Sequence, residues 1–168
     1  MTAVSDSSED NRSHPSAGTP QGAIVVDEVL GRFVRGSLPL PGGGCLVDSS
    51  FSRRLELEGR TVVLLLDTKD AAEAQRLLPR LRRAVEGSTT LRRRALEAVV
   101  LEFSVSPVTE EELGQAQADL LLDTIVVDDG MDVVLHLTDS CGQHVMDGYW
   151  PSVRFDAEDQ MTDVTIEA

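Results

Sequence analysis

Four side chains in the last third of the chain have the composition of a metal site: His136, Asp139, Cys141 and His144. Zinc accepts imidazole, thiolate and carboxylate ligands, and Cys141 and His144 are three positions apart in a segment typical of a loop. A Cys–His nucleophile would need Asp139 or another group to orient the imidazole. Because the spacing matches no standard zinc site, we predict no metal, no cofactor and no catalytic residue. A hydrolase or metal-binding enzyme that uses these four residues is kept as an alternative.

Two other motifs resemble ligand-binding loops but lack the necessary ligands. The glycines at 42–44 are not followed by the Lys and the Ser or Thr of a phosphate-binding loop. The acidic run at 128–132 lacks the alternating oxygen ligands and the final bidentate Glu of a calcium-binding loop. We therefore predict a plain loop at 42–44 and a hairpin turn at 128–132, where Asp-Gly separates two apolar runs.

The charge of the chain is divided unevenly along its length. The 168 residues include 15 Lys and Arg against 29 Asp and Glu, which gives a net charge of −14. Residues 1–100 have a net charge of +1, whereas residues 101–168 contain 16 acidic residues and one basic residue, Arg154. Such acidity suits a basic protein partner, or serves only solubility, and it argues against a nucleic-acid partner, which requires clustered Lys and Arg. The candidate partner surface combines these carboxylates with two adjoining aromatic rings: Glu110, Glu111, Glu112, Asp128, Asp129, Asp132, Tyr149 and Trp150.

Most basic residues fall on the expected helices. Arg76, Arg80 and Arg83 share one helical stripe, and residues 92–94 are three consecutive arginines. We predict a solvated face that pairs with the acidic part of the chain, with an interaction patch as the alternative. Aromatic residues make up only 4% of the chain, so platforms for stacking nucleic-acid bases are missing.

The hydropathy pattern predicts a cytoplasmic protein without a membrane partner. The longest apolar run, 62–66, is far shorter than the roughly 20 residues of a membrane-spanning helix. The N-terminus lacks the basic and apolar regions of a secretory signal. In the cytoplasm Cys45 and Cys141 would both remain reduced.

The elements that must position these residues follow from the periodicity of apolar side chains. Residues 1–22 are rich in Ser, Asp, Pro and Gly and predict a disordered tail, followed by a single domain over 23–168. Strands are expected near 23–36, 51–58 and 61–66, and again over 121–138 and 153–167, where they form two hairpins.

Three helices are expected between these groups of strands. The first has an apolar stripe of Ala74, Leu77, Leu78, Leu81 and Val85, and Pro79 within the same segment should kink or restart the helix. Thr89 or Thr90 would cap the second, which runs to about Glu102, and a capping box at Thr109 would begin the third, which runs to about Asp119. Helices bracketed by strands predict an α+β domain, an antiparallel sheet with two to three helices packed on one face. The side chains expected to face inward from the second helix are Leu91, Ala95, Leu96, Val99, Val100 and Phe103.

Several short motifs between Leu30 and Ile166 occur in a recognisable order. They are Leu30-Gly31-Arg32-Phe33, the turn Glu58-Gly59-Arg60, the helix start Thr109-Glu110-Glu111-Glu112 and a last hairpin that contains Val153-Arg154-Phe155-Asp156. This order resembles a bacterial family, domain of unknown function 2262. The aromatic–Gly–His step of that family is replaced here by Asp147-Gly148-Tyr149. The resemblance implies a fold and no activity, because the family has no established one.

Three functions follow as expectations. The first is a non-enzymatic cytoplasmic binding protein, of the type of an immunity protein, whose acidic last third neutralises a basic protein partner. The second is the hydrolase or metal-binding enzyme that uses His136, Asp139, Cys141 and His144. The third is a structural or regulatory domain without a small-molecule site.

Overall fold

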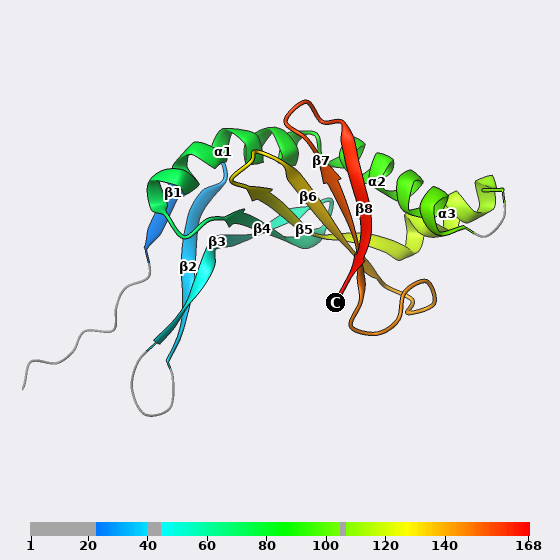
Figure 1. Ribbon diagram of the computed structural model, residues 1–168, viewed down its shortest axis with the longest axis horizontal. Coiled ribbons are helices and arrows are strands. Elements are labelled where there is room, and N and C mark those ends of the chain that lie inside the picture. Colours follow the sequence, from blue (N-terminus) through cyan, green and yellow to red (C-terminus); the bar gives the residue numbers. More distant parts are fainter. Residues whose placement is uncertain (1–22, 40–44, 105–106) are drawn as a thin grey trace, which may run out of the picture.

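All strands of the computed structural model belong to one sheet, in which they follow one another in chain order (Figure 1). The structure describes residues 23–39, 45–104 and 107–168. The disordered tail expected at 1–22 and the loop expected at 42–44 lie outside the described residues. The eight strands and three helices are β1 (Ile24–Asp27), β2 (Gly31–Pro39), β3 (Cys45–Leu57), β4 (Arg60–Asp67), α1 (Ala71–Glu86), α2 (Ser88–Phe103), α3 (Glu110–Asp119), β5 (Leu120–Asp128), β6 (Val133–Asp139), β7 (Trp150–Phe155) and β8 (Met161–Glu167).

One parallel pair determines where the helices lie. Every neighbouring pair of strands is antiparallel except β4 and β5. A parallel pair cannot be joined by a tight hairpin, so the connection must cross the sheet, and it contains all three helices. The helices consequently lie along one side of the sheet (Figure 1). This arrangement confirms the predicted α+β class, with the β4–β5 pair as the departure from a purely antiparallel sheet.

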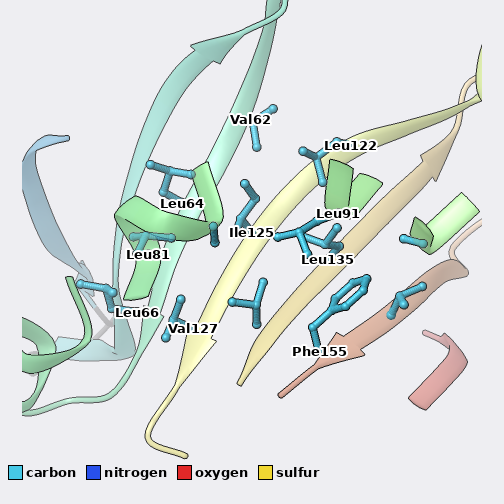
Figure 2. Close-up of a cluster of buried hydrophobic side chains, with 14 of the residues drawn as sticks. Val62, Leu64, Leu66, Leu81, Leu91, Leu122, Ile125, Val127, Leu135 and Phe155 are labelled. Atoms are coloured by element: carbon cyan, nitrogen blue, oxygen red, sulfur yellow. The ribbon is translucent and has the colours of Figure 1, made fainter. Parts of the chain in front are cut away.

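The core fills the space between this side of the sheet and the helices. Figure 2 shows Leu64 and Leu66 of β4 close to Leu81 of α1, with Ile125 of β5 and Leu135 of β6 continuing the same layer of side chains. All five side chains are fully buried. Each contributes roughly 1.5–3 kcal/mol relative to an exposed position, which makes this layer the main source of stability.

The helix boundaries correct two expectations. Helix α1 continues through Pro79 and is not restarted there, because the fully buried Leu78 and Leu81 on either side hold both halves against the sheet. Helix α2 begins directly after Gly87 rather than at a Thr89 or Thr90 cap. Its last residue, Phe103, is half exposed instead of facing inward.

The predicted start of α3 is confirmed. The Thr109 hydroxyl accepts from the backbone N–H of Glu112, and the Glu112 carboxylate accepts from the backbone N–H of Thr109. This capping box stabilises the N-terminus of a helix that has few buried side chains of its own.

The two ends of the C-terminal half of the sheet carry different connections. Strands β5 and β7 run toward the turns at 128–132 and 156–160, which together form what we call the turn end. Strands β6 and β8 run the opposite way, toward α3 and the loop at 140–149, which form what we call the loop end. In Figure 1 α3 lies at the right-hand extreme of the molecule.

Arginines of α1 reach across to the turn end. Arg80 is only 4% exposed, and it donates to the carbonyl oxygen of Met131 (3.0 Å) and pairs with Asp159 Oδ1 (2.8 Å). Arg83 donates to the carbonyl oxygen of Ala157. The predicted pairing of this stripe with the acidic part of the chain is therefore confirmed, but Arg80 is buried rather than solvated.

Candidate functional site

The loop at 140–149 is organised around the carboxylate of Asp139. Its Oδ1 accepts from the backbone N–H groups of Cys141 (3.2 Å) and Gly142 (3.1 Å). Its Oδ2 accepts from those of His144 (2.6 Å) and Val145 (3.0 Å). Burial raises the pKa of Asp139, but these hydrogen bonds outweigh it and hold the pKa well below its usual range. Asp139 therefore serves to shape the loop rather than to bind a ligand directly.

The loop brings Cys141 and His144 together with a residue that the sequence did not single out, Asp119. His144 Nε2 lies 3.0 Å from Asp119 Oδ2, and the ligand atoms of all three residues lie within 4.8 Å of one another. The pairing of Leu120 with Asp139 in the β5–β6 hairpin places Asp119 beside Ser140. Counting back along both strands from the Asp-Gly turn brings Asp119 close to this loop, but the irregularity between Leu122 and Thr124 shifts the register by one residue, so the sequence alone does not give this contact.

His136, the remaining residue of the metal-like group predicted from the sequence, does not join this cluster because it points to the other face of the sheet. Its neighbours Leu135 and Leu137 face the helices, and side chains alternate along a strand. On its own face His136 packs against Trp150, with ring centroids 6.0 Å apart, and lies 3.7 Å from a carboxylate oxygen of Glu167. Burial lowers the pKa of this imidazole. The four predicted side chains therefore do not form one site.

The geometry of Cys141 does not suit a nucleophile. Its thiol donates to Asp139 Oδ1 at 3.2 Å. Partial desolvation and this hydrogen bond raise the pKa of the thiol. A nucleophilic cysteine requires a stabilised thiolate and a base that takes its proton. The carboxylate of Asp139 instead stabilises the protonated thiol.

A groove formed by the described residues lies next to this cluster. Its volume is about 720 Å³, and it lies between α2, α3, the loop at 140–149 and the end of β8. Its apolar lining includes the exposed side chains of Met146 (72%) and Phe103 (48%), with Tyr149 and Ile166. Its polar lining includes Glu112 and Gln115 of α3 and Gln143 and His144 of the loop.

The predicted partner surface is divided between the two ends. Glu110, Glu111 and Glu112 begin α3 at the loop end, whereas Asp128 and Asp132 bind Arg154 at the turn end and Asp129 is exposed there. The nine residues of β5 separate the two groups by roughly 25–30 Å. Tyr149 lines the groove, but Trp150 lies with His136 on the opposite face.

Searches with models of protein families, against curated proteins and against solved structures find no match for this chain. The resemblance to the bacterial family named above thus remains a prediction. None of the described helices is long and apolar enough to span a membrane.

Proposed function

We propose that this domain is a non-enzymatic binding protein that takes an amphipathic, positively charged segment of a protein partner into the groove at its loop end. The observation that carries the proposal is a cluster of exposed large apolar side chains within the most acidic part of the chain. Neutralising a basic protein, as an immunity protein does, is the role that such a site would serve.

The apolar part of the site suits a protein segment. Single exposed apolar residues are common, but Phe103, Met146, Tyr149 and Ile166 gather on one groove. Aromatic residues and Met are enriched where proteins bind one another. A volume of about 720 Å³ accommodates several side chains from one face of a helix, the mode in which amphipathic helices enter grooves.

The charge around the groove favours a positively charged partner. None of the described residues that line it is Lys or Arg. The exposed carboxylates of Glu102 and Asp147 flank Phe103 and Met146 in the chain, and Glu112 is part of the lining. Arg154, the one basic residue after position 100, is held by Asp128 and Asp132 at the other end. Lys and Arg on the partner would therefore meet carboxylates that no Lys or Arg of the groove lining neutralises.

The test uses a fluorescent 18-residue peptide of Leu and Lys, arranged so that a helix would place all Leu on one face. Fluorescence anisotropy should show binding that weakens as salt is raised, because part of the attraction is between charges. A scrambled peptide of the same composition and a peptide with Glu in place of Lys should bind at least tenfold more weakly.

Two double variants separate the groove from the rest of the surface. The change Phe103→Ser with Met146→Ser should weaken binding at least tenfold, because both side chains line the groove. The matched control is Val26→Ser with Val29→Ser, which changes two other exposed apolar side chains near the opposite edge of the sheet and should leave binding unchanged. Equal binding of the scrambled peptide, or equal loss in both double variants, would overturn the proposal. So would sedimentation that shows a second copy of the chain occupying the groove.

A further inference from the structure

We propose that Asp119, Cys141 and His144 bind one zinc ion at the loop end. The three ligand atoms, one carboxylate oxygen, one sulfur and one imidazole nitrogen, already lie within 4.8 Å of one another. They come from two separate segments, the junction of α3 with β5 and the loop after β6. This inference is independent of the proposed binding function, although the two sites are adjacent.

The distances fit zinc after a small adjustment. Zinc binds sulfur at roughly 2.3 Å and nitrogen or oxygen at roughly 2.0–2.2 Å, so the ligand atoms of a tetrahedral site are about 3.3–3.7 Å apart. The pair His144 Nε2 and Asp119 Oδ2 is at 3.0 Å. The largest separation, 4.8 Å at most, must shorten by about 1 Å, which rotation of partly exposed side chains can supply.

The backbone around the three ligands is already ordered by other hydrogen bonds. The N–H and the hydroxyl of Ser140 both donate to the carbonyl oxygen of Asp119, each at 2.8 Å, which ties the loop to the end of α3. Asp139 fixes the backbone of Cys141 and His144 by accepting from their N–H groups. Hydrogen bonds of this kind around metal ligands hold them in place before the ion binds.

The ligand set determines which metal fits. One sulfur and one nitrogen favour zinc over the oxygen-binding ions calcium and magnesium. When the ion binds, the S–H bond of Cys141 breaks, the sulfur keeps the electron pair and bonds to zinc, and the proton passes to the buffer. The two negative ligands then balance the charge of the ion. Three protein ligands leave the fourth position to water or to a group that enters the groove beside His144.

Calorimetric titration of the reduced, chelator-treated full-length chain with zinc chloride tests this site. We expect one ion per chain and release of a proton, seen as a dependence of the heat on the ionisation enthalpy of the buffer. Cys141→Ser and the combined change Asp119→Asn with His144→Ala should each weaken binding at least tenfold. Cobalt as a substitute for zinc should give a sulfur-to-metal absorption band that Cys141→Ser abolishes.

The other histidines and the other cysteine supply the controls. His14→Ala, His136→Ala and Cys45→Ser should each leave zinc affinity unchanged, and thermal unfolding without metal should confirm that every variant is folded. The proposal is wrong if no stoichiometric zinc binds, or if zinc binding depends on these control residues instead. Repeating the peptide titration with chelator separates the two sites, because binding of the Leu and Lys peptide does not require the metal.

Discussion

The turn end and the loop end of the sheet both contain several carboxylates, but these carboxylates have different partners at the two ends. At the turn end Asp159 pairs with Arg80 and Arg83, and Asp128 and Asp132 pair with Arg154. At the loop end the described partners of carboxylates are histidines: His144 lies 3.0 Å from Asp119 and His136 lies 3.7 Å from Glu167. The difference lies in what the arginines bind: Arg80 and Arg83 of α1 and Arg154 of β7 pair with carboxylates at the turn end. At the loop end Arg92 of α2 donates to the backbone carbonyl oxygens of Gln117 and Leu120 and not to a carboxylate.

This contrast shows that net charge does not by itself locate a binding surface. Carboxylates that arginine reaches are part of the structure, since they hold turns against the helical layer. Those of the loop end surround exposed apolar side chains and remain available to a partner. Four predictions, made with three variants, test whether the two ends differ in this way.

The largest effect is expected from Arg80→Ala at the turn end. Its loss removes the side-chain donor to the carbonyl oxygen of Met131 and one of two donors to that of Asp156. It also removes the closest cation of Asp159 and leaves a cavity in a buried position. We expect the free energy of unfolding to fall by about 3 kcal/mol, measured by urea denaturation. Arg93→Ala, at an exposed position of α2, should change it by less than about 0.5 kcal/mol. If Arg80→Ala and Arg93→Ala lowered the free energy of unfolding equally, the paired arginine at the turn end would contribute no more to stability than an exposed one.

A smaller effect is expected from Asp139→Asn at the loop end. An amide cannot accept all four backbone hydrogen bonds, so we expect a loss of about 2 kcal/mol. The loss should be concentrated in the loop and be seen as faster hydrogen exchange at residues 141–145. Asp147→Asn, in the same loop but exposed, is the matched control and should leave exchange unchanged.

The same variant predicts a pH dependence. The pKa of Asp139 is lowered in the folded protein, so its stabilisation is fully present above the unfolded pKa of about 3.9. That stabilisation is lost as the pH falls through this value toward the lowered folded pKa. The difference in unfolding free energy between wild type and Asp139→Asn should therefore be constant from pH 8 to about pH 5 and shrink below about pH 4. A difference that grew on acidification would contradict the assigned role.

The smallest effect is expected from Thr109→Ala, which removes half of the capping box of α3. Loss of such a cap costs about 1 kcal/mol, measured by thermal unfolding. Because α3 forms one wall of the groove, peptide affinity should fall with it. Glu111→Ala, an exposed position in the same turn, should affect stability by less than about 0.5 kcal/mol. If the Thr109→Ala variant bound the peptide with unchanged affinity, the capping box of α3 would not be needed for the shape of the groove.

Much of the fold could be predicted from the sequence, but the sheet connection and the site could not. The capping box at Thr109 and the Asp-Gly turn at 128–132 are local signals, and both occur where they were expected. The parallel pairing of β4 with β5 has no local signal, because residues 71–119 separate the two strands. Grouping His136 with Cys141 failed for another reason: proximity in the chain does not account for the face of a strand to which a side chain points.

The sequence by itself determined the order of the elements, the helix start at Thr109 and the accumulation of acidic residues after residue 100. These properties depend on neighbouring residues, since periodicity and capping act over a few positions. Only the tertiary structure decided which carboxylates arginine neutralises and that Asp119 joins Cys141 and His144. Those contacts depend on the register of β5 and β6, with its irregularity between Leu122 and Thr124, and on the path of the helices across the sheet. Both are set by packing between segments far apart in the chain.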